Sequence, residues 1–138
     1  MFSRFTAKAF SKSAAMSERE RAAHGAKGEA LAALYYERSG YCVLERNFRT
    51  RQGEIDVIVQ KGNTLVFVEV KTRGERAIAQ PREFVTGQKQ RRLILAAQRY
   101  LLLHPQSAES VLRFDVVEVI LPEQGRPLLR CIENAFTL

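Results

Sequence analysis

Three carboxylates and one lysine interrupt two stretches of the chain that otherwise have the character of buried β-strands. The first stretch contains Glu54 and Asp56, and the second contains Glu69 and Lys71. Charged side chains in apolar strands carry a large desolvation cost unless they are paired or bind a metal ion. Carboxylate oxygens are ligands that Mg²⁺ prefers. The pattern therefore predicts a site for a divalent metal.

The turn between the two stretches determines how these side chains face one another. Residues 61–64, Lys-Gly-Asn-Thr, have the composition of a tight turn and predict a single hairpin. If Gln60 pairs with Leu65, the register places Asp56 opposite Glu69. Carboxylates that face each other across a ladder repel, and a cation between them would remove that repulsion.

An ion-pair network is the alternative explanation for the same residues. In that network Lys71 neutralises Glu69 or Glu54, and no metal is required. Three acids against one lysine would leave negative charge uncompensated, which favours the metal site.

A helix is predicted from about Ser17 to Ser39, and it carries a further acid. Ser17 and Glu20 have the spacing of a capping box, and Gly40 is a stop signal. At 100° per residue, Glu29 falls within an apolar arc. A carboxylate there is either another site residue or the partner of a cation such as Arg49, and the helix alone leaves both open. The arc consists of Ala22, Ala26, Ala33 and Tyr36.

The remaining elements define the fold class. Residues 41–49 predict a first strand, ahead of the hairpin. Residues 86–103 predict a second helix with a clear apolar stripe, and residues 111–121 and 128–132 predict two further strands. The order of helix, three strands, helix and two strands predicts an α/β fold with a central mixed sheet flanked by helices.

The charge distribution suggests a polyanionic partner. The formal net charge is +7, and residues 72–106 contain seven Arg and Lys against two Glu, whereas residues 107–138 contain three Arg against five acids. A local basic excess beside a carboxylate cluster suits DNA or RNA, although a solvated basic face would look the same. The candidate phosphate contacts, chosen by charge and position, are Arg73, Lys89, Arg91 and Arg92.

Other classes of protein are not indicated. No apolar run approaches the ~18 residues of a membrane span, so no membrane association is expected. The Gly-rich motifs of nucleotide-binding loops are absent from the sequence, and Cys42 and Cys131 fit no zinc pattern. Residues 1–17 have the composition of a disordered or targeting-like extension; alternatively, the start codon is assigned too early and Met16 is the true start.

The segments GEIDVIV and VFVEVKTR resemble the YraN family of bacterial proteins. That family is similar to the PD-(D/E)XK nuclease superfamily, which includes archaeal Holliday-junction resolvases. The resemblance runs over roughly Ala22 to Val119 and implies a restriction-endonuclease-like core, with residues 18–138 forming one endonuclease-like domain in the bacterial cytoplasm. Ile55 stands where the superfamily's name has proline, a common substitution that leaves the following acid in place.

The resemblance also implies a role for each site residue. Asp56 and Glu69 match the metal-binding acids, Lys71 matches the catalytic lysine, and Glu29 matches the acid of the first helix. Glu54 belongs to the family's GEID pattern and is a possible additional acid. The implied activity is hydrolysis of phosphodiester bonds in DNA, including branched DNA, with Mg²⁺ or Mn²⁺, by an enzyme that can act as a homodimer. The alternative is an inactive nucleic-acid-binding or partner-binding module on the same fold.

Overall fold

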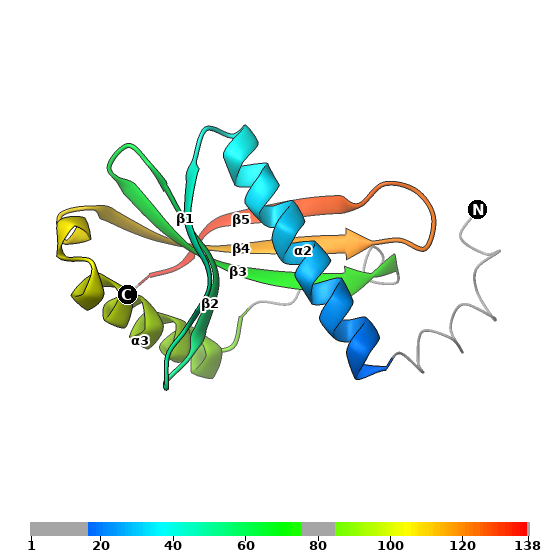
Figure 1. The fold of residues 1–138 in the computed structure, drawn as a ribbon, viewed down its shortest axis with the longest axis horizontal. Coiled ribbons are helices and arrows are strands. Elements are labelled where there is room, and N and C mark those ends of the chain that lie inside the picture. The colour runs from blue at the N-terminus through cyan, green and yellow to red at the C-terminus, as the bar shows by residue number, and fades with distance from the viewer. Residues whose placement is uncertain (1–16, 76–84, 138) are drawn as a thin grey trace.

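The computed structural model describes residues 17–75 and 85–137, and Figure 1 shows their fold. The predicted order of helix, three strands, helix and two strands is confirmed. The predicted extension, residues 1–17, lies outside the described residues except for Ser17. The elements are α2 (Glu18–Arg38), β1 (Cys42–Arg49), β2 (Glu54–Lys61), β3 (Thr64–Gly74), α3 (Gly87–Leu103), the 3-10 helix η3 (Pro105–Ser107), β4 (Val111–Leu121) and β5 (Leu128–Phe136).

The five strands form one mixed sheet in the order β1-β2-β3-β4-β5. The pairs β1–β2, β2–β3 and β4–β5 are antiparallel, whereas β3 and β4 are parallel along their full length. Parallel neighbours need a long crossover, and here α3 lies within it. The predicted α/β fold with a central mixed sheet flanked by helices is confirmed, and it is consistent with a restriction-endonuclease-like core.

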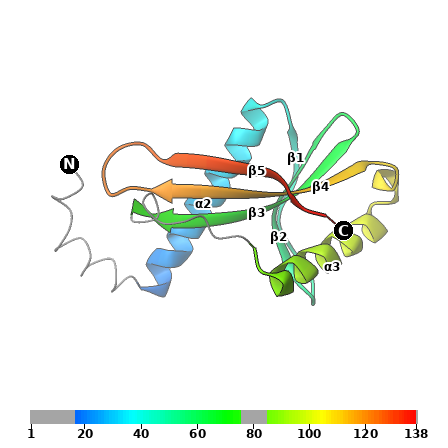
Figure 2. The same cartoon turned by 180° about the vertical axis from the view of Figure 1, so that it is seen from behind.

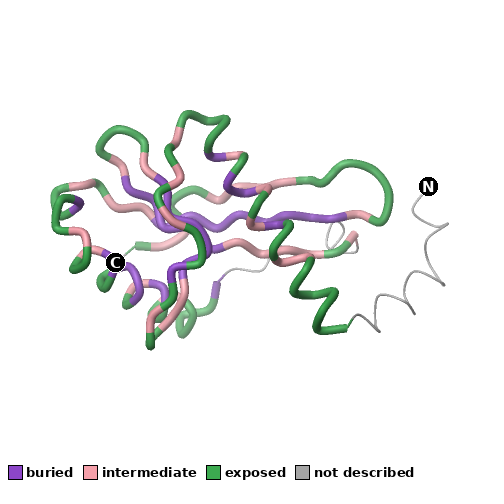
Figure 3. Tube along the Cα trace, viewed as in Figure 1, coloured by how far each residue is buried: buried purple, intermediate pink, exposed green. Residues whose placement is uncertain are grey.

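The two helices cover opposite faces of the sheet, as the opposed views of Figures 1 and 2 show. Valines at alternate strand positions, such as Val57 and Val68, pack against α2. Larger side chains, such as Phe67, pack against α3 around Tyr100. Figure 3 shows the buried positions gathering along β4 and where the strands cross. In residues 17–75 and 85–137 no helix is long and apolar enough to cross a membrane.

The N-terminal cap of α2 is confirmed, whereas its predicted packing face is partly wrong. The Ser17 hydroxyl accepts from the Glu20 amide at 3.2 Å, and the Glu20 carboxylate accepts from the Ser17 amide at 2.8 Å. Ala33 is buried as predicted, but Ala22 and Ala26 are exposed. The reason is that α2 crosses the sheet obliquely, so its burial begins only at Gly28.

A buried carboxylate that was not singled out from the sequence joins α2, β4 and β5. Asp115 is 1% exposed, and its two oxygens accept four short hydrogen bonds from three residues, besides a long one from the Cys131 thiol at 4.0 Å. The Tyr36 hydroxyl donates at 2.7 Å, the Arg113 guanidinium donates twice at 2.9 Å, and the Asn134 amide donates at 3.0 Å. Asn134 has a φ of 52°, where β5 shifts register against β4. This irregularity explains why only residues 128–132 of the last strand were predicted, whereas β5 continues to Phe136.

Replacing Asp115 with alanine should lower the free energy of unfolding by about 3–5 kcal/mol, because the buried Tyr36 hydroxyl and the partly buried Arg113 guanidinium would lose their common acceptor. Chemical denaturation measures this loss. The matched control is Glu133→Ala, which removes the longer and more exposed ion pair of the same arginine at 3.9 Å. That control should cost less than about 1 kcal/mol. Equal losses for the two variants would contradict the assigned role of Asp115.

Candidate metal centre

The register of the β2–β3 hairpin is the one predicted from the turn. Lys61 pairs with Thr64 and Gln60 with Leu65, and Gly62 adopts a φ of 57° in the turn between them. The ladder continues as far as Val57 and Val68, which are paired. The next residues along the two strands are Asp56 and Glu69, so the turn sets the position of both acids.

The strands separate at this point, and a carboxylate takes the place of the missing ladder bond. Figure 1 shows β2 turning steeply away while β3 continues across the molecule. The Val70 amide donates to Oδ2 of Asp56 at 2.8 Å. A backbone amide that is shielded from water needs an acceptor. The Asp56 carboxylate supplies one to Val70 at a position where β2 no longer pairs with β3. The Asp56 carboxylate is thereby held in the fork between the strands.

Asp56 and Glu69 form a buried pair of like charges. Their exposed fractions are 9% and 7%. Burial raises the pKa of the Asp56 carboxyl most, contact with the Glu69 carboxylate raises it further, and the Val70 amide opposes both effects. The resulting pKa of Asp56 is about 8. One oxygen of Glu69, Oε2, is buried and accepts no hydrogen bond.

Among the described residues, the ion pair of this site joins Glu69 to Lys89, near the start of α3. Its Nζ lies 3.3 Å from Oε2 of Glu69, outside hydrogen-bonding geometry, and the Lys89 side chain is about half exposed. The alternative network inferred from the sequence assigned this role to Lys71. Lys71 follows Glu69 by two residues, so it projects to the same side of β3. It makes no ion pair with any residue in the described ranges, which leaves its ammonium available to a ligand.

Glu29 reaches the hairpin acids from α2. Burial raises the pKa of the Glu29 carboxyl most, and the charges of Asp56 and Glu54 raise it further. The charge of Arg46 and the nearby Asn47 side chain lower this pKa. The suggested partner Arg49 instead forms a long ion pair with Glu54 at 3.6 Å, where both side chains are substantially exposed. Glu29 is therefore in electrostatic contact with the site.

The donor set fits a hard divalent cation. Across residues 17–75 and 85–137 no three Asp, Glu, His or Cys side chains already form a metal-binding group. Mg²⁺, however, is commonly bound by one or two carboxylates, with water and substrate phosphate completing its shell. Asp56 and Glu69 supply two carboxylates, and Oε2 of Glu69 accepts no hydrogen bond, so a metal ion there would compete only with the ammonium of Lys89 among the described residues. Their mutual repulsion would be relieved by a cation.

Replacing Lys89 with methionine should tighten Mg²⁺ and Mn²⁺ binding, because the ammonium competes with a metal ion for Glu69. Partly exposed ion pairs are worth about 0.2–1 kcal/mol, so the gain should be at most about fivefold in Kd. Calorimetric titration measures it, with Lys27→Met on the exposed face of α2 as the control. Weaker metal binding by the Lys89 variant would show that the lysine supports the site instead.

The predicted basic residues occupy different environments. Arg73 lies 3.3 Å from Glu118 of β4, which is a second buried acid missed in the sequence. Arg91 and Arg92 are exposed on α3. Asp115 and Glu118 also interrupt an apolar strand, so the desolvation cost of their charges is the signal in the sequence that marks them.

Comparison with known proteins assigns the chain to a protein family. The family model described as "Uncharacterised protein family UPF0102" matches residues 28–119, from α2 through most of β4. The chain belongs to the UPF0102 family. The matched residues of this UPF0102 chain include Glu29, the whole β2–β3 hairpin and the first turn of α3. They also include both segments that carry the resemblance to the YraN family.

UPF0102 relatives from several bacteria are similar over nearly their whole length. A UPF0102 protein of Symbiobacterium thermophilum is 50% identical over 112 residues, which is 81% of this chain and 94% of the relative. One from Geobacter metallireducens is 46% identical over 114 residues, covering 83% and 92%. One from Clostridium botulinum is 42% identical over 115 residues, covering 83% and 94%.

Proposed function

We propose that this protein is a metal-dependent nuclease that hydrolyses phosphodiester bonds in DNA. The observation that supports this most is the burial of the Asp56 and Glu69 carboxylates together at the strand fork, with one Glu69 oxygen lacking a hydrogen-bond donor. Lys71 lies two residues from Glu69 on the same side of the strand. The resemblance of these segments to the PD-(D/E)XK superfamily supports the same activity.

Asp56 and Glu69 would hold Mg²⁺, or Mn²⁺ in its place, with Glu29 contributing directly or through a water molecule. When bound, such an ion lowers the pKa of a coordinated water and stabilises charge on phosphoryl oxygens. Glu54 raises the pKa of both Asp56 and Glu29, so it adds to the negative potential that attracts the cation. Glu54 lies at the start of β2 and forms an ion pair with Arg49.

Lys71 and the basic residues would act on the substrate. The ammonium of Lys71, free of ion pairs in the described ranges, would orient the attacking water or stabilise the developing charge. Arg91 and Arg92 are exposed on α3 and would contact phosphates without reading sequence. Resolvase-like members of the superfamily act as homodimers. We expect the same for cleavage of branched DNA in the bacterial cytoplasm.

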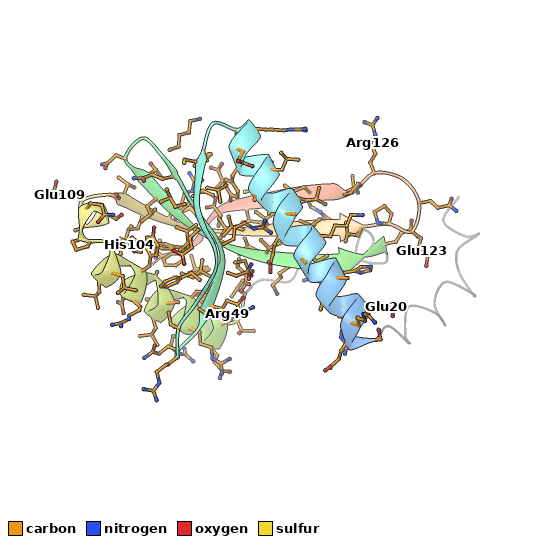
Figure 4. The ribbon with its side chains drawn as sticks, viewed as in Figure 1. Glu20, Arg49, His104, Glu109, Glu123 and Arg126 are labelled. Carbon is orange, nitrogen blue, oxygen red and sulfur yellow. The ribbon has the colours of Figure 1, made fainter. Side chains whose placement is uncertain are left out.

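Titration of Mg²⁺ and Mn²⁺ by calorimetry, followed by incubation with labelled DNA, tests the proposal. The proteins are wild type, Asp56→Asn, Glu69→Gln and the charge-matched control Glu123→Gln, an exposed residue of the β4–β5 loop (Figure 4). The substrates are branched, single-stranded and duplex DNA, with RNA as a comparison. Wild type and the control should bind metal and cleave DNA. Both site variants should lose binding and cleavage together.

Two results would contradict the proposal in different ways. Metal binding without cleavage of any substrate would favour a nucleic-acid-binding or partner-binding module on the same fold. If wild type fails to bind metal even with DNA present, the nuclease proposal fails, and the ion pair of Glu69 with Lys89 has only a structural role.

A further inference from the structure

A pocket of about 690 Å³ lies between the β1–β2 connection and the C-terminal half of α3. Its walls include Arg49, Arg51 and Gln52 from the connection and Arg99 from α3. The hairpin acids do not line it, so it is separate from the candidate metal centre. Its volume is within the range of ligand-binding pockets, about 300–1,000 Å³.

The pocket carries positive charge that its own walls do not neutralise. No acidic residue lines it. Arg51 and Arg99 are exposed and form no ion pair with any residue that the structure describes. The ion pair of Arg49 with Glu54 is long and exposed, so it contributes little. Planar guanidinium groups match phosphate oxygens in two-point hydrogen bonds. The pocket is therefore suited to a phosphate-bearing ligand.

The connection that carries these arginines is held in a defined shape. The Thr50 hydroxyl oxygen accepts from the Gln52 and Gly53 amides, at 3.2 and 3.0 Å, and its hydroxyl donates to the Gly53 carbonyl at 2.9 Å. A Cβ atom on Gly53 would lie 2.6 Å from the backbone oxygen of Arg92, so the glycine allows close packing against α3. The pocket walls from the two elements are thus fixed relative to each other.

The floor of the pocket indicates which part of a nucleic acid it would contact. Phe48 lines the pocket but is buried, and its ring packs edge-on against Tyr100 with centroids 5.3 Å apart. A buried ring offers little face for stacking a base. The exposed arginines and Gln52 are the accessible groups. They suit the sugar–phosphate backbone.

We propose that this pocket binds the DNA backbone a few nucleotides from the bond that is cleaved. The inference rests on the proposed nuclease function. Gln52 and Asp56 are four residues apart, so their Cα atoms are separated by at most ~14 Å. Phosphates along one DNA strand advance about 3.4 Å per step along the axis, so this upper limit corresponds to at most about four steps. The pocket would position the strand relative to Asp56.

Binding of a fluorescein-labelled 20-base-pair duplex, followed by anisotropy in EDTA between 50 and 200 mM NaCl, tests the pocket without cleavage. The test variant is Arg51→Ala/Arg99→Ala. The control is Arg38→Ala/Arg126→Ala, which removes the same charge from exposed positions outside the pocket lining. In Figure 4 Arg126 lies in the β4–β5 loop, well apart from Arg49, which lines the pocket. Loss of two phosphate contacts should weaken binding at least about tenfold at 100 mM NaCl and reduce the salt slope by about 1.8.

The inference would be overturned if wild type and the test variant bound the duplex with equal affinity and equal salt slope. It would also be overturned if the control variant weakened binding as much as the test variant does. If the test variant binds normally while wild type still cleaves DNA with Mg²⁺, only the pocket assignment fails. If the test variant loses binding but wild type cleaves nothing, the pocket binds nucleic acid and the nuclease proposal fails.

Discussion

Replacing Lys71 with methionine is expected to lower metal-dependent DNA cleavage by about 100- to 1,000-fold, the usual effect of removing one group that stabilises transition-state charge. Metal affinity should change little, because the ion pair of Glu69 is with Lys89 and not with Lys71. Single-turnover cleavage at saturating Mg²⁺, together with calorimetric titration, separates the two effects. Lys71→Arg should restore part of the activity if the positive charge is what matters.

The control for this experiment is Lys61→Met, which removes an exposed lysine from the turn of the same hairpin. Its cleavage rate should stay close to that of wild type. If Lys71→Met cleaves normally, the lysine takes no part in the chemistry. If it instead loses metal binding, Lys71 supports the geometry of the site and is not a catalytic residue.

Replacing Asp56 with asparagine is expected to make the metal-free protein more stable above neutral pH. The pKa of Asp56 is about 8 in the folded protein, well above its ordinary value near 4 in an unfolded chain. Between these values the folded state binds more protons than the unfolded state, so the free energy of unfolding falls as pH rises. The slope contributed by this group is at most about 1.4 kcal/mol per pH unit. Asp56→Asn should remove most of it.

Urea unfolding at pH 5, 6, 7 and 8, in EDTA and in saturating Mg²⁺, measures this effect. Mg²⁺ should stabilise wild type, and more at pH 8 than at pH 5, because binding requires the ionised carboxyl. It should not stabilise Asp56→Asn. Glu123→Gln, at an exposed position, should follow wild type throughout. An unchanged pH slope for Asp56→Asn would show that Asp56 does not carry a raised pKa.

The hairpin illustrates what was predictable from the sequence. The composition of residues 61–64 and the period-two pattern of the strands were sufficient for the register, because a tight turn fixes which residues face each other. The order of elements and the fold class followed from similar local patterns. These features depend on neighbours within a few residues along the chain.

The features that were missed depend on contacts between distant parts of the chain. The partner of Glu69 is Lys89, twenty positions away, and the spacing of the hairpin pointed to Lys71 instead. Asp115 is satisfied by Tyr36 and Asn134, from elements far apart in sequence. The pairing of β2 with β3 ends at Val57 and Val68, whereas β2 stays paired with β1 as far as Glu54, and no short motif in the hairpin encodes that difference.

The hydrogen bond from the Val70 amide to Asp56 offers a spectroscopic view of the site. A backbone proton that donates to a carboxylate changes its chemical shift when that carboxylate is protonated, because the bond loses its charge. In ¹⁵N-labelled protein, the Val70 signal would therefore follow the ionisation of Asp56 directly as pH is varied. Cation binding at the same carboxylate would move that signal again, with no need for a substrate. The Val70 amide would then report both the ionisation of Asp56 and the binding of a cation.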